Sequence, residues 1–528
     1  MKKIFFILVI TMVVFAACKK NLNQVPFSSA TTPTFYQQPS DFIQAVNATY
    51  NALRGYPDRA LFLSEVRSDN IYPTNDVGRD PDPINNFSLG IAPNVLVEEA
   101  WSANFVGIFR ANTLLEQIAK NGSYVGSTAL ATRLTAEAKF LRAFFYFDLI
   151  KYFGKLPIID HTVSAAEATT IGRSSVTDVY AFIIADLQFA VANLPVNFSG
   201  PFPNYTATDV GRATKFSAEA LLAEVYMARS GATYSIDGPG LGLNEWGSAL
   251  TLLQDVITNG GFVFNPNPYT WLTPGGVPTT GIFSYSNQNP TTNKEAVFDV
   301  MYLTGQTNPV LGASYPWQLV PQAYLNTLSG TNTNAAGALG TPSVSNDLLN
   351  SYSTVAPADT RRTPFLHTSP YNNLGTTDVH AFFRKYLDTT KVPTSVNRFD
   401  WGINFIAIRY TDVLMRKAEC ILHGATGTQG DVDGIVNQVR ARAGQPAISN
   451  VTLPQLFDER RKEFAGEGTR WFDLQRSGNL ITIMNAWRTI EDATLHKMSP
   501  IVANFIIYPV PQSQMDAAPG LYIQNPGY

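Results

Sequence analysis

Residues 132–153 read TRLTAEAKFLRAFFYFDLIKYF and carry the strongest helical pattern in the chain. Apolar residues recur there at three- and four-residue steps in two adjacent stripes: Ala136, Phe140, Ala143, Phe147 and Ile150 in one, and Leu141, Phe145 and Leu149 in the other. Because residues at these steps share a helix face, two stripes indicate a helix that is buried on more than one side. Gly154 and Pro157 follow and end the pattern. The sequence therefore predicts a mostly α-helical fold around this segment.

Other segments on both sides show helical spacing or helix-start signals. They are residues 41–53, 98–120, 174–194, 215–230, 245–259, 406–423, 431–443 and 454–466. Neighbouring segments would pair as helix–turn–helix units, and because one pair alone cannot bury its apolar face, such pairs stack into a scaffold. We expect an N-terminal helical scaffold over residues 41–259 and a C-terminal one over residues 405–528.

The segment between these scaffolds, residues 260–404, has a different character. It contains NPNP at 265–268, TPGG at 273–276 and a polar stretch at 329–346, and a short strand-like piece at 296–300 interrupts it. Long irregular segments in compact proteins are often functional. We therefore predict a loop-rich insertion with short strands that faces a ligand.

The chain begins with the pattern of an exported protein. Two lysines precede an apolar run at residues 4–17, which is shorter than the roughly 20 residues that span a bilayer. Residues 1–17 thus read as a signal peptide, and Phe15 to Cys18 resembles a bacterial lipobox. The alternative is an ordinary signal peptide with an accidental cysteine. We predict lipidation of Cys18, a leader over residues 18–40 and attachment to a membrane through acyl chains.

Composition restricts the possible partners. Removal of Lys2 and Lys3 leaves 36 of the 38 basic residues against 41 acidic ones, a formal charge of −5. Nucleic-acid binding needs a basic face, so we expect no nucleic-acid partner. Aromatic residues make up 12% of the chain, and flat rings with polar edges suit sugar and peptide ligands. Cys420 is the only cysteine besides Cys18, and its apolar surroundings predict a buried free thiol.

The segment ERRKEFAGEGTR at 459–470 permits two interpretations. Glu463 and Glu467 lie four residues apart and would share a helix face, which suits the carboxylate pair of a glycosidase. Arg460 and Arg470 lie near them in the sequence, so a structural ion-pair network of Arg460, Glu463, Glu467 and Arg470 is the favoured interpretation. We expect no catalytic residue, and the alternative is a lipid-anchored all-helical glycoside hydrolase.

Metal and cofactor sites are not expected. The five histidines never stand four residues apart, and the chain has no Gly-Lys-Ser/Thr phosphate loop and no Gly-x-Ser-x-Gly elbow.

Several motifs together resemble the SusD/RagB family of Bacteroidetes outer-membrane lipoproteins. They are AEAKFLRA at 136–143, YFG at 152–154, NKEAVF at 293–298, RYTDVL at 409–414, KAE at 417–419, ERRKEFAGEG at 459–468, RWFDL at 470–474, YPVP at 508–511 and QNPGY at 524–528. The resemblance implies tetratricopeptide-like helix pairs in a right-handed superhelical scaffold. It also implies a non-catalytic protein, lipid-anchored at the cell surface on the outer membrane, that captures a glycan or a peptide and passes it to a SusC-like TonB-dependent transporter.

Ligand contacts are expected in two places. The loop that follows Asp69 combines an aromatic ring with amide, acid and guanidinium groups, which can stack on sugars and bridge hydroxyls. The insertion adds aromatic residues among Pro and Gly. The candidates are Tyr72, Asn75, Asp76 and Arg79 in the loop, and Trp271, Tyr285, Tyr315 and Trp317 in the insertion. We predict a solvent-exposed platform of Trp271 or Trp317 with Tyr72; a turn-rich surface loop, core packing of the rings and a scaffold without a small ligand are the alternatives.

Overall fold

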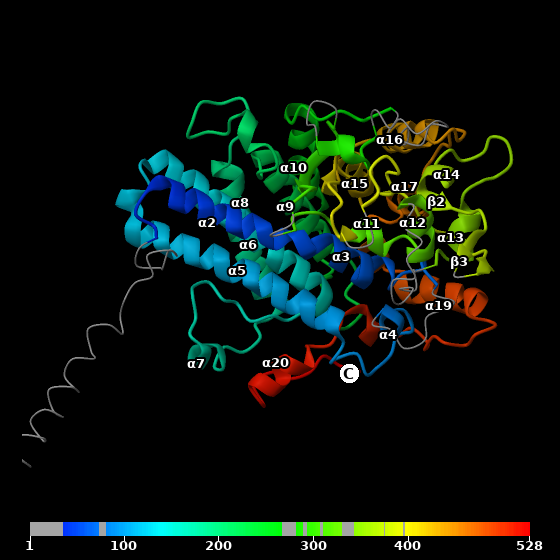
Figure 1. Cartoon of the computed structure of the whole chain (residues 1–528), viewed down its shortest axis with the longest axis horizontal. Coiled ribbons are helices and arrows are strands. Elements are labelled where there is room, and N and C mark those ends of the chain that lie inside the picture. Colours follow the sequence, from blue (N-terminus) through cyan, green and yellow to red (C-terminus); the bar gives the residue numbers. More distant parts are fainter. Residues whose placement is uncertain are drawn as a thin grey trace, which may run out of the picture.

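The computed structural model describes residues 35–72, 81–266, 281–288, 293–306, 310–329, 343–373, 375–393 and 397–528 (Figure 1). In these ranges the chain is mostly helical, with three pairs of short strands. The α-helices before the insertion are α2 (Pro39–Asn51), α3 (Tyr56–Ala60), α4 (Pro81–Asn85), α5 (Val95–Asn121), α6 (Thr128–Phe153), α7 (Ala165–Ala168), α8 (Val176–Asn193), α9 (Lys215–Ser230) and α10 (Trp246–Asn259).

The insertion and the C-terminal part contain shorter elements. The α-helices are α11 (Tyr315–Gln318), α12 (Gln322–Ser329), α13 (Asn346–Ser351), α14 (Arg362–Phe365), α15 (Tyr410–Leu422), α16 (Gln429–Arg442), α17 (Leu453–Phe464), α18 (Arg470–Ser477), α19 (Leu480–Glu491) and α20 (Gln512–Ala517). The strands are β1 (Ala296–Val300), β2 (Leu366–His367), β3 (Tyr371–Asn373), β4 (Thr376–Asp378), β5 (Phe382–Phe383) and β6 (Phe405–Arg409). Short 3-10 or π turns are η2 (Ala52–Gly55), η3 (Leu61–Glu65), η4 (Gly122–Tyr124), η5 (Ala207–Asp209), η7 (Tyr285–Gln288) and η9 (Ala503–Ile506).

Helix α6 is the central helix that its two apolar stripes predict. Its C-terminal half is buried on all sides, including the charged Asp148. The side chain of Ser127 accepts a hydrogen bond from the Leu130 N–H and caps the first turn. Gly154 ends the helix with a φ of +68°, and a Cβ there would lie 1.9 Å from the Asp237 carbonyl oxygen, so only glycine fits this turn.

Successive helices pack on one another along the chain. Helices α2, α5 and α6 pack against one another, α6 packs on α8, α8 on α9, and α9 on α10. Helix α10 then contacts α15, which begins about 150 residues later and packs on α16 and α17, so the two helical parts form one scaffold (Figure 1). The fold is thus mostly α, with the tetratricopeptide-like arrangement that was predicted.

Two strands pair where the insertion joins the C-terminal helical part. Strand β1, near its beginning, pairs antiparallel with β6, which directly follows its end, and Ala296 lies opposite Arg409. The strand predicted at 296–300 is confirmed. The helix predicted to start at residue 406 is wrong in its first turn, because Ile406 to Arg409 are recruited into β6 by the ladder with β1, and the helix begins at Tyr410.

The two helical parts and the insertion share a hydrophobic core. The main core runs through both helical parts and the insertion, and Trp101, Trp401 and Cys420 all belong to it. Cys420 is a buried free thiol, as predicted.

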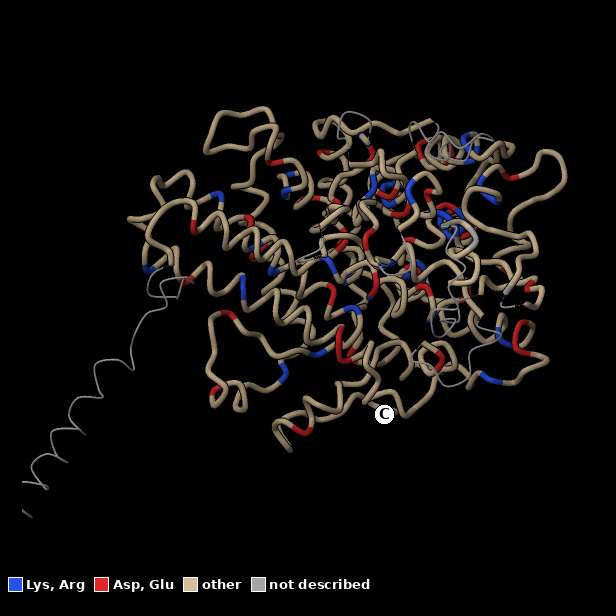
Figure 2. Tube along the Cα trace, in the orientation of Figure 1, with Lys and Arg blue, Asp and Glu red and all other residues tan. Residues whose placement is uncertain are grey.

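Within the described ranges, α8 is the one helix long and apolar enough to cross a membrane, but α6 and α9 pack against it. Figure 2 shows basic and acidic residues intermingled in the half of the molecule that holds α15, α16 and α17.

Candidate ligand-binding surface and its buried support

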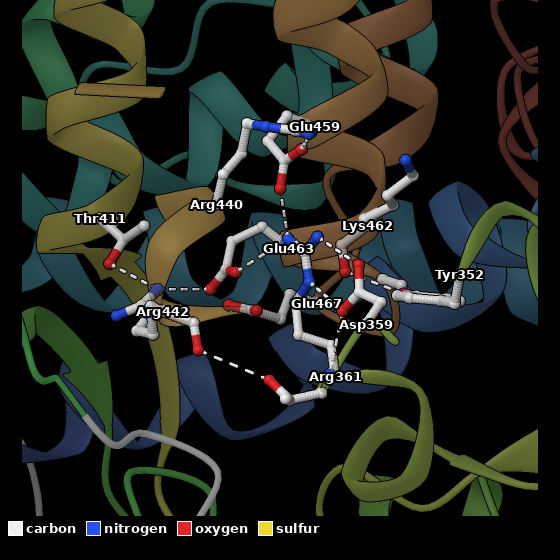
Figure 3. Close-up of polar contacts among 12 residues, drawn as sticks. Tyr352, Asp359, Arg361, Thr411, Arg440, Arg442, Glu459, Lys462, Glu463 and Glu467 are labelled. Atoms are coloured by element: carbon white, nitrogen blue, oxygen red, sulfur yellow. Dashed lines mark hydrogen bonds and ion pairs between the residues drawn. The ribbon is translucent and has the colours of Figure 1, made fainter. Parts of the chain in front are cut away.

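A buried network of ion pairs joins the insertion to the C-terminal helices (Figure 3). We name it the central network. Its acids are Glu295, Asp359, Glu459, Glu463 and Glu467, and its bases are Arg361, Lys385, Arg409, Arg440 and Arg442. Five acids face five bases, so the formal charge of the network is zero and its carboxylates have cations as partners.

Glu463 on α17 lies at the middle of this network and is fully buried. Its carboxylate contacts Arg442 at 2.7 Å, Arg409 at 3.0 Å and Arg361 at 3.4 Å. Burial opposes the charged form, but the three guanidinium groups outweigh it and hold the pKa of Glu463 well below its usual range. A carboxylate held in this way is neither a proton donor nor an accessible nucleophile near neutral pH.

Glu467 and Glu295 extend the network in two directions. Glu467 accepts from Lys385 at 2.5 Å and from Arg409 at 2.9 Å, and burial lowers the pKa of Lys385 to about 8. The carboxylate of Glu295, just before β1, forms ion pairs with Arg442 at 2.8 Å and with Arg409 at 3.2 Å. Glu295 and Arg409 stand in the NKEAVF and RYTDVL motifs, but nothing in the sequence pairs them.

The predicted burial and ion pairing of the 459–470 segment are confirmed, but its partners were predicted wrongly. Arg460 binds Asp412 at 2.7 Å and Asp473 at 2.9 Å. Arg470 binds both carboxylate oxygens of Asp69 at 2.8 Å. Because Arg460 and Arg470 lie close to Glu463 and Glu467 in the sequence, they were expected to pair with these two glutamates. Asp473 lies 13 residues after Arg460, whereas Asp412 and Asp69 come from distant segments, because buried charges pair wherever tertiary packing brings opposite charges together.

The AGEG run at 465–468 binds another carboxylate through its backbone. The N–H groups of Gly466 and Gly468 donate to Glu65 Oε1 at 2.9 and 3.0 Å, and the Asn70 side chain donates to Glu65 Oε2 at 2.8 Å. Both glycines have positive φ, +82° and +76°. The run therefore links α17 to the segment after α3 and has a structural role.

Three of the predicted ligand-binding rings are core residues. Tyr72, Tyr315 and Trp317 are 4%, 2% and 5% exposed. The prediction of an exposed platform is wrong for Tyr72 and Trp317, and burial also rules out Tyr315 as a ligand contact. Tyr72 donates from its hydroxyl to Asp492, and Trp317 donates from its indole to Gln322, so each buried ring satisfies its polar atom internally. Tyr315 and Trp317 belong to α11, a short helix that packs on α3. The sequence around α11 has no helical apolar spacing, so this helix was not predicted.

The remaining candidates are half-buried or outside the described residues. Tyr285 is half-buried, stacks at 6.5 Å on Trp401 and donates from its hydroxyl to the Lys391 carbonyl at 2.5 Å. Its remaining accessible surface keeps it a candidate for binding. Asn75, Asp76, Arg79 and Trp271, like Cys18, lie outside the described residues.

The insertion places two half-buried tyrosines side by side that the sequence did not single out. Tyr324 of α12 and Tyr371 of β3 have ring centroids 6.0 Å apart, at 81° to each other, and both pack on Phe382. The Tyr371 hydroxyl donates to Asp378 at 3.0 Å, and His380 contacts the same carboxylate at 2.8 Å. Partly exposed rings next to hydrogen-bonding groups suit a sugar or peptide ligand. We name Tyr324 and Tyr371 the tyrosine pair.

No group of three or more His, Cys, Asp or Glu side chains among the described residues has an arrangement that could hold a metal ion.

Comparison with known proteins relates this mostly helical chain to the SusD-like proteins. A family model described as "SusD family" matches residues 351–528, and another described as "Starch-binding associating with outer membrane" matches residues 84–227. SusD-like protein P2 of Formosa agariphila is 25% identical over 90% of this chain and 91% of its own, and a SusD-like protein of Bacteroides ovatus is 26% identical over 90% and 82%.

Solved structures give the same fold. A "Laminarin binding SusD-like protein" has a TM-score of 0.71 at 23% identity, covering 93% of this chain and all of that one. Surface glycan-binding protein A from Bacteroides thetaiotaomicron in complex with laminarihexaose has a TM-score of 0.71 at 21% identity with the same coverage. The chain belongs to the SusD/RagB family.

Proposed function

We propose that this protein is a lipid-anchored binding protein of the bacterial outer membrane that captures a glycan and passes it to a partner SusC-like TonB-dependent transporter. The site residues that we assign to ligand capture are Tyr324 and Tyr371, with Tyr285 as a further contact. Cys18 would carry the acyl anchor, and the protein would have no catalytic step of its own.

The observation that carries the proposal is the geometry of the tyrosine pair. Two rings that meet nearly at right angles present an apolar corner, and the Asp378 carboxylate with His380 lies at its edge. A sugar ring has apolar C–H faces and hydroxyl groups around its rim, so it can stack on one ring while its hydroxyls reach the polar groups. A tyrosine has few torsions to fix, so such contacts cost little conformational entropy.

Membership in the family supports the rest of the proposal. The solved relatives named above are described as binding laminarin or glycans, and one family model is described as associating with the outer membrane. The lipobox-like segment before Cys18 agrees with a protein attached to that membrane.

A hydrolase is the less favoured interpretation. It depended on Glu463 and Glu467 as a carboxylate pair, and both are buried in the central network with cationic partners. A glycosidase pair must flank the scissile bond in an accessible cleft, with the carboxyl groups about 5 to 10 Å apart. The central network lacks that access, so we assign Glu463 and Glu467 to stability.

A binding screen tests the proposal. The soluble chain over residues 19–528 is titrated with defined oligosaccharides and with peptides, and each bound ligand is examined afterwards for cleavage. We expect saturable binding of at least one oligosaccharide that is recovered intact. Binding of peptides alone would contradict the glycan assignment, and release of shortened products by the purified protein would contradict the non-catalytic one.

A further inference from the structure

An arginine without an acidic partner lies beside the tyrosine pair. Arg384 directly follows β5, and its backbone N–H donates to the Phe365 carbonyl at 2.8 Å, which continues the pairing of β5 with β2. Because side chains alternate along an extended strand, Arg384 projects to the same side as Phe382. Phe382 is the ring on which Tyr324 and Tyr371 both pack, so Arg384 faces the surface that we assign to ligand capture.

The residues that alternate with these two face the opposite side. Lys385 points into the central network, where its ammonium group donates to Glu467 at 2.5 Å. Phe383 lies on the same side, because a Cβ at Gly466 would lie 3.3 Å from its ring. Lys385 is therefore a fully buried cation with a carboxylate partner, whereas Arg384 is a half-buried cation next to the tyrosine pair.

The guanidinium group of Arg384 forms no ion pair with a carboxylate of the described residues. Every Asp and Glu of the insertion lies within the described ranges, so the rest of the insertion has none to supply. The Nε atom of Arg384 is enclosed, but Nη1 and Nη2 keep accessible surface and have no hydrogen-bond partner among the described residues. A ligand can therefore reach the two nitrogens at the end of the guanidinium fork.

The charge of Arg384 acts on the same aromatic rings. Burial lowers the pKa of Arg384, and Tyr324 is the only titratable group of the described residues that opposes this shift. Burial also lowers the pKa of His367, whose ring stacks on Phe382, and the Arg384 charge lowers it further. A half-buried cation without an opposing carboxylate has lost part of its hydration and has no ion pair to replace it. An anionic group that reaches Arg384 is therefore bound favourably.

The negative charge of this surface lies at its other end. Asp378 accepts from the Tyr371 hydroxyl at 3.0 Å and contacts His380 at 2.8 Å, and it is not among the groups that act on Arg384. Because like charges repel, an anionic group belongs at the Tyr324 end, next to Arg384. Neutral hydroxyl groups belong at the Tyr371 end, where Asp378 can accept from them.

We propose that the glycan captured by the tyrosine pair is acidic, with a carboxylate or sulfate group paired with Arg384 and a sugar ring stacked on Tyr324. A guanidinium group offers parallel N–H donors to two oxygens of such a group, which gives direction as well as affinity. Both kinds of anion stand at the rim of a sugar ring, so the ring can stack on an aromatic side chain while the anion reaches past its edge. The inference rests on the proposed glycan-binding function and names the ligand class of that site.

Paired ligands that differ only in charge test this inference. Oligomers of galacturonate, glucuronate and mannuronate are each compared with the same oligomer after reduction of its carboxyl groups. Sulfated galactan oligomers are compared with their desulfated forms, so the two series distinguish carboxylate from sulfate. The soluble chain over residues 19–528 is titrated with each ligand by calorimetry. We expect at least one acidic oligomer to bind roughly tenfold or more tightly than its neutral counterpart, because hydrogen bonds to charged groups contribute that much.

Variants of Arg384 assign the preference to this residue. Arg384→Gln should lower the affinity for the acidic oligomer to that of its neutral counterpart and leave the neutral affinity unchanged. Arg384→Lys keeps the charge without the planar fork and should retain part of the preference. Arg110→Gln makes the same change at a half-buried arginine of α5, which donates to the Ala48 carbonyl at 2.7 Å, and leaves the preference unaltered. If Arg384→Gln does not fold, the natural protein is titrated at rising salt, and its preference for the acidic oligomer must shrink.

The contrary results separate this inference from the proposed function. Neutral oligomers that bind as tightly as the acidic ones overturn the inference and leave glycan capture intact. A preference for the acidic oligomer that persists in folded Arg384→Gln overturns the role of Arg384. Binding of polyglutamate peptides without binding of any oligosaccharide overturns both the inference and the proposed glycan capture.

Discussion

Arg409, the last residue of β6, donates two hydrogen bonds of 3.0 Å to one carboxylate oxygen of Glu463 on α17. Fifty-four residues separate the two in sequence. The pair links the strand that closes the insertion to the helix that carries the ERRKEF motif, so it holds the insertion against the C-terminal helices. Both side chains are buried, so this relationship stabilises the arrangement of the two parts and is unavailable to a ligand.

Glu463→Gln is expected to destabilise the protein strongly. The change leaves the side chain in place but removes the charge that Arg361, Arg409 and Arg442 share. Removing one partner of a buried ion pair costs about 3–5 kcal/mol. Urea unfolding and thermal melting measure the loss. Glu167→Gln, at an exposed residue of α7, is the control and should melt like the natural protein. Unchanged stability of Glu463→Gln would show that the central network does not support the fold.

Asp69→Asn should reveal a stabilisation that depends on pH. Burial alone would raise the pKa of Asp69, but Arg461 and Arg470 outweigh it and lower the pKa from 3.8 to about 2. Because the folded-state pKa is the lower one, the stabilisation is fully present above about pH 4 and is lost as pH falls towards about 2. The shift corresponds to roughly 2–3 kcal/mol.

Chemical unfolding at a series of pH values tests this. The difference in unfolding free energy between the natural protein and Asp69→Asn should be largest near neutral pH and should shrink as pH falls below about 4. A difference that stays constant across this range would mean that the ionised carboxylate of Asp69 contributes nothing beyond its shape.

Gly468→Ala should cost more than a glycine replacement made in open space. A Cβ at Gly468, where φ is +76°, would lie 2.5 Å from the Cβ of Ala60. Gly424 has a φ of +91° and no heavy atom within 4 Å of the same position, which makes Gly424→Ala the control for backbone strain alone. We expect about 1–2 kcal/mol for the control and about 1–3 kcal/mol more for Gly468→Ala. Equal melting temperatures would contradict the close packing of the AGEG run on α3.

The helices could be predicted from the sequence because their signals are local. Apolar spacing identified the helices around residues 132–153 and 215–230, and the second one agrees with α9 at both ends. Gly154 marked a true end because its positive φ and its lack of a Cβ are properties of the residue itself. Strand β6 was missed because β1, about 110 residues earlier, supplies its hydrogen-bond partners.

The site could be predicted only in part. The sequence indicated that Glu463 is buried and ion-paired, because so many charges in one short helix need partners. It did not reveal Arg361, Arg409 and Arg442, since buried pairs depend on tertiary packing and not on spacing. Tyr72, Tyr315 and Trp317 failed as exposed candidates because an aromatic ring in an irregular stretch of sequence can still pack in the core. Trp317 stands among loop residues but occupies the core, whereas Tyr324 lies on a helix and keeps accessible surface.

Cys18→Ala is expected to release the protein from membranes. The lipobox-like residues before Cys18 predict that the thiol carries the acyl chains, and without them the remaining chain has no lipid to insert. Fractionation of cells and metabolic labelling with a fatty acid provide the measurement. Lys19→Ala, which keeps the cysteine, serves as the control and should remain labelled. A Cys18→Ala protein that is still labelled and still sediments with membranes would refute the lipid anchor.

The most direct test of glycan capture is calorimetric titration of Tyr371 variants with the oligosaccharide that binds best in the screen. Tyr371→Ala removes a ring of the tyrosine pair and should weaken binding by about 2 kcal/mol or more, while circular dichroism and melting stay near those of the natural protein. Tyr371→Phe keeps the ring, loses only the hydroxyl bonded to Asp378, and should retain most of the affinity. A folded Tyr371→Ala protein that binds the oligosaccharide as tightly as the natural protein would contradict the assignment of this surface.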